Sequence, residues 1–274
     1  MNLIFYYITG AFYGLGTMSH LAYVVSSRRL FYRIGQGALS AGFVLHTTTL
    51  IIRYHEGGYL PLTNLYESVS FFAWGILLVY LVIDYRYGIA VLGAFVSPIV
   101  LTLVVIGVAL PKRIIPLHPA LMSYWLPIHA ICAFLGDAVF ALTCCVGIMY
   151  LIQEHQIKSK KTTGLMRRLP SLEVLDEVNY RSLTVGFPLM TVGIVTGSVW
   201  ASYAWGSYWS WDPKETWSLV TWILYAVLLH QRLAMGWRGK KVALMAIIGF
   251  VSVLFTFLGV NLVLEGLHSY AEWK

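Results

Sequence analysis

Charge is scarce in this sequence. Asp, Glu, Lys and Arg together account for 11% of the 274 residues, whereas a soluble globular domain carries about 25%. Apolar residues account for 58%, and the mean hydropathy is +0.72. So little charge beside so much apolar surface excludes a soluble domain. We therefore predict an integral membrane protein that crosses the bilayer several times.

Cysteine is also scarce. The three cysteines, Cys132, Cys144 and Cys145, fall in one apolar segment and form no C-x-x-C pair. This spacing offers no disulfide framework. It also argues against a zinc site, because zinc takes about four closely spaced ligands that often include cysteine. The motif C-x-x-C-H is missing as well, so the chain is not itself a c-type cytochrome.

Long apolar runs, by contrast, recur along the whole chain. A helix needs about 20 such residues to cross the hydrocarbon core of a bilayer. We predict about eight transmembrane helices, at 2–26, 34–54, 66–84, 88–108, 125–151, 181–203, 216–235 and 242–264. No connection is long enough for a separate globular domain, so we expect one all-α transmembrane domain over residues 1–274. The first run lacks a basic n-region and a small-residue cleavage site, so we expect a retained helix rather than a signal peptide.

The positive charge is distributed unevenly between the two sides of the membrane. With eight spans both termini lie on one side, and the loops on the other side hold 14 of the 19 Lys and Arg residues. These basic loops are 28–33, 84–87, 152–181 and 232–241. The positive-inside rule makes them cytoplasmic, so both termini face the outer, periplasmic side. The net charge of +7 thus reports topology and attraction to anionic membrane lipid, and it predicts no nucleic-acid partner.

Tryptophan is concentrated in one connection, at about 204–216. Six of the ten tryptophans lie between Trp200 and Trp222, and the connection runs into a further apolar segment. We call four of them the tryptophan shelf: Trp205, Trp209, Trp211 and Trp217. Aromatic residues collect at membrane–water interfaces. A flat apolar surface also suits a large planar ligand. Composition alone leaves both interpretations open.

Two short motifs predict helix starts. Asp212 is a favourable N-cap, Pro213 suits the first helical position, and Glu215 at the third position resembles a capping box. Asn64 with Glu67 forms a similar pair before the third apolar run. Both motifs are explained by helix capping without any ligand.

Four histidines fall at two levels of the predicted topology. His129 and His268 lie at the outer surface beside the tryptophan shelf, whereas His46 and His230 lie within the membrane. Ionisable groups within a bilayer are costly and usually face the protein interior. Two imidazoles that face each other across a flat apolar slot commonly hold haem iron. A hydrogen-bonded structural role remains the alternative for His46.

The stretch from Trp205 to Glu215 resembles the tryptophan-rich WWD signature of haem-handling membrane proteins. Nearly end to end, the chain is similar to the CcsA/ResC family of cytochrome c assembly proteins. Further matching pieces are Pro61–Glu67, Trp125–His129, Gly186–Pro188 with Gly193 and Gly197, His230 before Gly236–Gly239, and Leu267–Tyr270. The ending at His268 and the eight spans favour CcsA over the related CcmC and CcmF proteins.

The resemblance implies a path for haem b. Haem would enter from the cytoplasmic side at an inner site with His46 and His230 as axial ligands. It would then move to an outer site between His129 and His268. The outer haem surface implied by the signature consists of Trp205, Trp209, Trp211, Asp212 and Trp217. Lys112, Arg113 and Lys214 are the candidate partners of the haem propionates on that side.

The resemblance also implies an activity and partners. Together with a CcsB/ResB-type membrane protein, the chain would attach haem to the CXXCH cysteines of apocytochrome c, as a cytochrome c–haem lyase. The alternative is a haem exporter or carrier that presents haem to another protein and catalyses nothing. A third interpretation is a transporter for an unrelated aromatic ligand. We expect the protein in a bacterial inner membrane, with its active site on the outer face, in preference to a plastid thylakoid.

Overall fold

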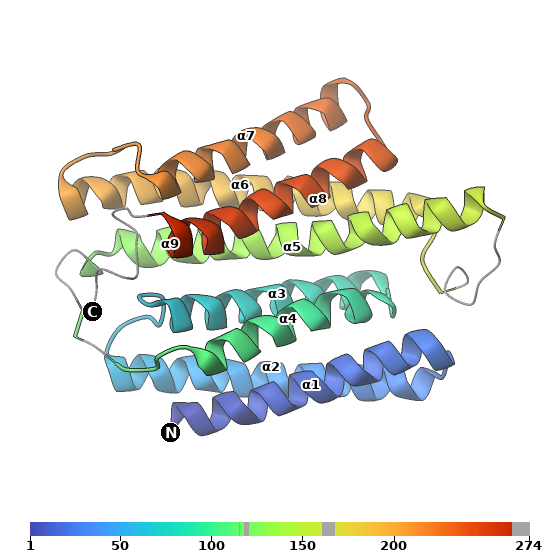
Figure 1. The fold of residues 1–274 in the computed structure, drawn as a ribbon, viewed down its shortest axis with the longest axis horizontal. Coiled ribbons are helices and arrows are strands. Elements are labelled where there is room, and N and C mark those ends of the chain that lie inside the picture. The colour runs from blue at the N-terminus through green and yellow to red at the C-terminus, as the bar shows by residue number, and fades with distance from the viewer. Residues whose placement is uncertain (115, 118–120, 161–167, 265–274) are drawn as a thin grey trace. The chain divides into compact units, whose positions relative to one another are not determined.

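The computed structural model of the chain describes residues 1–114, 116–117, 121–160 and 168–264. These residues are almost entirely helical and contain no β-strand (Figure 1). The helices are α1 (Asn2–Ser26), α2 (Arg29–Gly57), α3 (Leu65–Tyr87), α4 (Leu92–Ala109), α5 (Trp125–Lys158), α6 (Leu172–Trp205), α7 (Pro213–Ala234), α8 (Lys240–Leu254), the π-helix η2 (Phe255–Gly259) and α9 (Val260–Val263). The all-α prediction is confirmed.

The eight predicted apolar segments fall on α1 to α8, with η2 and α9 continuing the last one. Within the described residues, five helices are long and apolar enough to cross a membrane: α3, α4, α5, α6 and α8 with η2. The remaining spans, and the side on which the termini lie, stay predictions.

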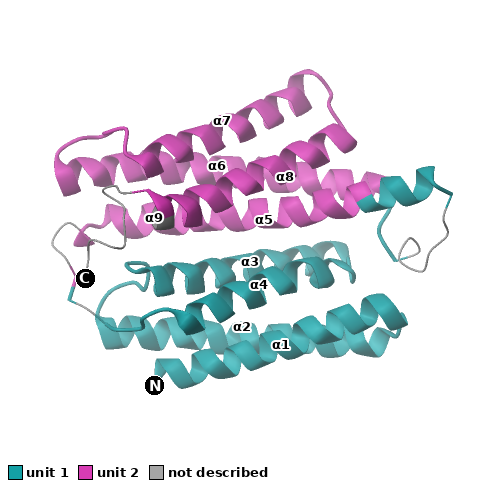
Figure 2. Cartoon of the chain, viewed as in Figure 1, with its two compact units in different colours: residues 1–116, 152–171 teal, residues 117–151, 172–274 magenta. Residues whose placement is uncertain are grey.

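The chain divides into two compact units (Figure 2). Unit 1 comprises residues 1–116 and 152–171, and unit 2 comprises residues 117–151 and 172–274. The prediction of a single functional domain stays a prediction.

Unit 1 is built from α1 to α4, and its core contains several buried tyrosines. Tyr13 of α1 lies against Gly42 of α2, where an added Cβ would come within 2.6 Å of the ring. Tyr6 packs against Gly107 of α4 and donates its hydroxyl to the Val104 carbonyl at 3.2 Å. Small residues therefore let α2 and α4 approach α1 closely, as is usual between membrane helices.

Unit 2 is built from the other long helices and positions the tryptophan shelf. The rings of Phe140 in α5 and Tyr225 in α7 stack in its core. A Cβ added at Gly193 of α6 would lie 3.0 Å from the backbone of Ala133 in α5. The contact between these two helices is thus too close for a larger side chain, and it brings the start of α5 beside α6.

Candidate functional site

The connection between α6 and α7 carries the WWD stretch and has an unusual backbone. Gly206, directly after α6, has a φ of +78°, a conformation that glycine adopts readily. Trp211 also has a positive φ, of +60°. Left-handed backbone is rare for a bulky residue and costs about 1–3 kcal/mol. The connection is therefore a defined and strained turn that ends at the start of α7.

The start of α7 confirms the predicted helix cap. The Asp212 carboxylate accepts from the Lys214 amide at 3.1 Å, and Glu215 reaches back to the Asp212 amide at 3.2 Å. Asp212 is buried and is used as the N-cap. A contact between Asp212 and haem stays a prediction.

The tryptophans of the shelf lie in three different settings. Trp209 and Trp211 meet edge to face, with ring centroids 5.8 Å apart and planes at 88°. Trp205 meets Trp200 of α6 in the same way, with centroids 4.9 Å apart. Trp217 instead packs against Phe255 of η2 at 4.4 Å, so it joins α7 to the last helical segment. The predicted shelf is therefore not one flat stack of rings.

His129 lies near the start of α5 and is held by α6. Its Nδ1–H donates to the Gly193 carbonyl at 2.7 Å, because a carbonyl oxygen can only accept. Its ring is nearly parallel to that of Trp200, with centroids 6.1 Å apart. With the proton on Nδ1, a neutral imidazole carries its lone pair on Nε2. This is the arrangement of a histidine metal ligand, whose other nitrogen usually donates to a carbonyl or carboxylate.

Gly197 makes room for that imidazole. A Cβ added at Gly197 would come within 2.6 Å of Nδ1 and 2.7 Å of Cε1 of His129. His129, Trp200 and Trp205 thus form a continuous row within unit 2, and this row connects the histidine to the WWD stretch. His268, the predicted second outer ligand, lies outside the described residues.

The two inner histidines differ from each other. His46 of α2 is fully buried in unit 1, with the Tyr13 hydroxyl 3.1 Å from Nδ1 and the Ser70 hydroxyl 2.8 Å from Nε2. His230 lies near the end of α7 in unit 2, and its side chain is exposed. Both ring nitrogens of His46 are therefore occupied, and iron ligation there would displace one hydroxyl. The pairing of His46 with His230 stays a prediction.

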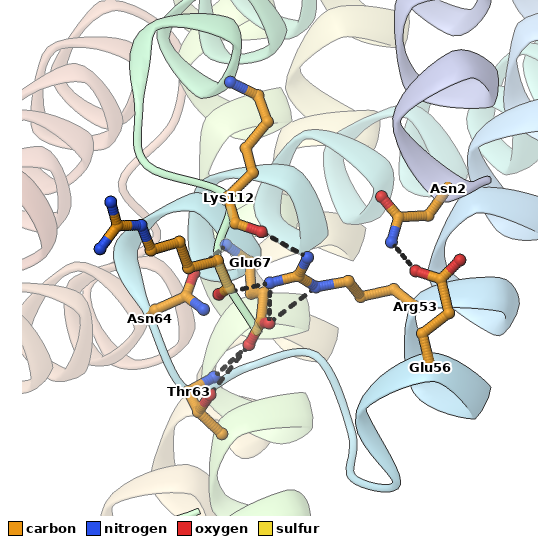
Figure 3. A network of polar contacts seen from close by, with 8 residues as sticks. Asn2, Arg53, Glu56, Thr63, Asn64, Glu67 and Lys112 are labelled. Carbon is orange, nitrogen blue, oxygen red and sulfur yellow. Dashed lines mark hydrogen bonds and ion pairs between the residues drawn. The ribbon is translucent and has the colours of Figure 1, made fainter. Parts of the chain in front are cut away.

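A buried polar network in unit 1 joins α2, the start of α3 and the segment after α4 (Figure 3). Arg53 of α2 donates to the Glu67 carboxylate at 3.0 Å and to the carbonyls of Lys112 and Arg113 at 2.8 and 3.1 Å. The other Glu67 oxygen accepts from the amide and the hydroxyl of Thr63, at 3.0 and 2.9 Å. Arg53 and Glu67 are 4% and 1% exposed, so this ion pair is removed from water.

The three predicted propionate partners lie in different settings. Lys112 Nζ donates to the carbonyls of Val108 and Leu110, so it satisfies the end of α4. Arg113 is held by its carbonyl while its side chain remains exposed. Lys214 lies at the start of α7. The assignment of Lys112, Arg113 and Lys214 as propionate partners stays a prediction.

The sequence prediction did not assign Trp200 to the site, and it named Gly197 and Glu215 without the roles that they have there. Trp200 stacks on His129, Gly197 makes room for it, and Glu215 holds the turn in addition to capping α7. The spacing of Trp200 and Gly197 along α6 offered one signal, because residues three and four apart share a helix face. No local pattern indicated that this face meets His129.

Comparison with known proteins agrees with these features. Residues 62–268 match the family described as "Cytochrome C assembly protein". The "Cytochrome c biogenesis protein CcsA" of Guillardia theta is 40% identical over 262 residues, which cover 89% of this chain and 87% of that protein. The proteins of the same name from Pyropia yezoensis and Parasynechococcus marenigrum (strain WH8102) are each 36% identical, over 98% and 95% of this chain and 92% and 94% of their own lengths.

A solved structure shares the fold. The chain named "Cytochrome c Heme Lyase CcmF" superposes with a TM-score of 0.67 at 16% identity over 94% of this chain. This chain spans only 46% of the length of that protein, so the likeness concerns the fold alone. The predicted resemblance to CcsA is confirmed by the relatives of that name. From the family match and these relatives, the chain belongs to the cytochrome c assembly protein family and acts in cytochrome c biogenesis.

Proposed function

We propose that the chain binds haem b as its substrate at the WWD stretch and attaches it to apocytochrome c. The observation that carries this proposal is the geometry of His129. Its Nδ1–H is committed to the Gly193 carbonyl, and its ring is set in plane by Trp200. An imidazole held in this way presents Nε2 as an iron ligand, and the carbonyl raises its basicity. The row from His129 through Trp200 to Trp205 leads to the apolar rings that would cover the macrocycle.

His268 is the proposed second axial ligand at the outer site. Two neutral imidazoles would hold the iron until the histidine of the CXXCH motif replaces one of them. In the attachment step, each cysteine sulfur bonds to a vinyl carbon of ferrous haem. The thiol hydrogen goes to the other vinyl carbon, so the addition changes no oxidation state. The chain mainly holds the vinyl group and the thiol near attack geometry.

His46 and His230 are the proposed ligands of an inner site through which haem passes first. The hydrogen bonds on His46 give this step a physical requirement. Either the Tyr13 or the Ser70 hydroxyl must release its nitrogen before iron can bind. His46 would thus alternate between a hydrogen-bonded state and an iron-bound state. Such an exchange is what we expect at a site that haem occupies only in transit.

The proposal includes the setting of the reaction. The distribution of basic residues supports a topology in which both termini and the WWD stretch face the outer side of the membrane. A bacterial inner membrane is the proposed location, and a CcsB/ResB-type membrane protein is the proposed partner. Maturation of an apocytochrome c in a host without its own pathway would distinguish a lyase from a haem carrier, because a carrier would load haem without forming thioether bonds.

Absorption spectroscopy tests the site directly. The purified chain should show a Soret band with six-coordinate, low-spin features, and His129→Ala and His268→Ala should each weaken it. Added imidazole should restore the band, because it replaces the missing ligand. The matched control is His155→Ala, an exposed histidine near the end of α5, which should leave the spectrum unchanged. If the wild-type chain contains no haem even when it is purified with the partner, the proposal is wrong. The tryptophan shelf would then be an aromatic belt at the membrane interface.

A further inference from the structure

Glu215 holds the backbone on both sides of Trp211. Its Oε2 atom accepts from the Ser210 amide at 2.8 Å, the Ser210 hydroxyl at 3.1 Å and the Asp212 amide at 3.2 Å. These two amides belong to the residues directly before and after Trp211. One carboxylate oxygen therefore fixes the segment that contains the left-handed tryptophan.

Burial of the indole does not explain why Trp211 adopts this conformation. The side chain is 69% exposed, so little apolar area is removed from water in exchange for the strained backbone. Strain of this kind persists only where the surroundings impose it, and it gathers at functional sites. Two residues of α7 hold this backbone: the Glu215 carboxylate accepts from the amides on both sides of Trp211, and the Thr216 hydroxyl donates to the Trp211 carbonyl at 3.3 Å. The result is an indole displayed at right angles to Trp209.

Helix capping does not explain all the bonds of Glu215 either. A capping box needs only the bond from Glu215 to the N-cap amide of Asp212. The two bonds to Ser210 lie outside the box, on the loop side of the strained residue.

The start of α3 provides a comparison within the same chain. Glu67 accepts from the amide and hydroxyl of Thr63, which directly precedes the N-cap Asn64, so no strained residue lies between them. Glu67 also has Arg53 as a counter-charge. Glu215, in contrast, is 9% exposed. It forms no ion pair with any residue that the structure describes. Its carboxylate is instead stabilised by hydrogen bonds and by its place in the first turn of a helix.

We propose that Glu215 is a positioning residue for the haem surface. Its carboxylate keeps Trp211 in the left-handed conformation, so that the indole forms one wall of the surface and Trp209 forms another. Glu215 itself does not touch haem. This inference rests on the proposed function, since it names the residue that sets the shape of the same site.

Amide hydrogen exchange of the haem-free protein provides the first test. In Glu215→Ala, peptides that cover residues 206–216 should exchange faster, whereas peptides from residues 217–234 should keep their wild-type rates. Glu215→Gln should retain most of the protection, because its amide oxygen can accept the same bonds. The matched control is Glu177→Ala, which removes an exposed glutamate of the same unit. Faster exchange confined to the first turn of α7, with wild-type rates over residues 206–211, would mean that Glu215 is only a helix cap, and would overturn the inference.

A double-mutant cycle on haem affinity provides the second test. Trp211→Ala should weaken haem binding by about tenfold, the upper range for one aromatic contact. Glu215→Ala should weaken it by a similar factor, and the double variant should lose no more than Trp211→Ala alone. Residues that act through one another are non-additive in this way. Losses that multiply would show that Glu215 acts independently of Trp211, and the inference would be wrong. If wild type binds no haem, the proposed function fails, and the exchange measurement alone decides the role of Glu215.

Discussion

At the scale of single residues, the position of His129 depends on the absence of a side chain at residue 197. The imidazole fills the space that a Cβ there would need, and its hydrogen bond to Gly193 fixes the ring orientation. The usual gain in helix stability from replacing glycine by alanine, about 1 kcal/mol, should therefore be reversed at this position.

We expect Gly197→Ala to push the His129 ring out of place and to cost about 1–3 kcal/mol of stability, as overpacked sites do. The hydrogen bond to Gly193 should break, and haem loading should fall as it does in His129→Ala. Gly14→Ala is the matched control, because nothing lies within 4 Å of a Cβ at that helical position. Thermal unfolding in detergent and the Soret absorbance per protein measure the two effects. Normal loading in Gly197→Ala would mean that the contact with His129 does not position an iron ligand.

At the scale of elements, the buried network of unit 1 joins α2, the start of α3 and the segment after α4. Removing one partner of a buried ion pair leaves an uncompensated charge, which costs about 3–5 kcal/mol. Replacing both partners with apolar residues of similar volume is often nearly neutral. The network can therefore be tested by comparing single and double substitutions.

Arg53→Met should destabilise the protein strongly, because Glu67 then lacks its counter-charge and the carbonyls of Lys112 and Arg113 lose their donor. The double variant Arg53→Met with Glu67→Leu should recover much of the loss. Arg181→Ala, which breaks an exposed ion pair with Glu177, should change stability by about 0.5 kcal/mol or less. Apparent Tm values in detergent measure all three variants. Equal losses in the single and double variants would show that the hydrogen bonds, rather than the charges, dominate.

The turn between α7 and α8 depends on two glycines that differ in their surroundings. Gly236 and Gly239 have φ values of +65° and +69°. Gly236 lies in open space, whereas a Cβ at Gly239 would come within 2.6 Å of the Tyr150 hydroxyl. The Gly239 amide also donates to Asp176, which forms an ion pair with Arg232. This turn is thus attached to the start of α6 as well as to α5.

Gly236→Ala should cost about 1–2 kcal/mol, which is the cost of a left-handed backbone with a Cβ. Gly239→Ala should cost more, by about a further 1–3 kcal/mol, because the added methyl group also displaces Tyr150. Gly239 has a ψ of −133°, outside the left-handed helical region, so the difference between the two apparent Tm values reports its backbone conformation together with its contact with Tyr150. Equal Tm values would mean that Tyr150 can move at no cost.

Sequence reasoning located the elements well because their signals are local. The apolar runs fall on helices α1 to α8, and Asp212 with Glu215 forms the predicted capping box. The prediction at α3 was correct for the Asn64 cap, but Glu67 reaches Thr63 instead of the Asn64 amide. The other oxygen of Glu67 accepts from Arg53, a partner 14 residues away that no local pattern indicates.

The site was less accessible to sequence reasoning because it depends on distant contacts. The carbonyl that holds His129 belongs to a residue 64 positions away, and the ring stacked on it comes from near the end of α6. Lys112 looked like a ligand for an anion, yet its ammonium group satisfies the carbonyls at the end of α4. Residue type indicated the chemistry, but only the packing of α5 on α6 determines which atoms can carry it out.

At the scale of the whole molecule, the proposed function requires the WWD stretch to face the compartment in which cytochromes c mature. That orientation rests on the distribution of basic residues. Two tyrosines allow a matched test, since Tyr85 and Tyr124 are 93% and 94% exposed. Tyr85 lies near the end of α3, within the predicted cytoplasmic loop 84–87, whereas Tyr124 lies just before α5 in a predicted outer connection.

In intact cells, a membrane-impermeant maleimide should label Tyr124→Cys and should not label Tyr85→Cys until the membrane is permeabilised. The chemistry and exposure of the two cysteines are equivalent, so the difference reports only the side of the membrane. A background that lacks Cys132, the one native cysteine that is not buried, removes competing labelling. The reverse pattern would place the WWD stretch and His129 on the cytoplasmic side. Haem could then reach these residues without crossing the bilayer, and the proposed path from an inner to an outer site would be wrong.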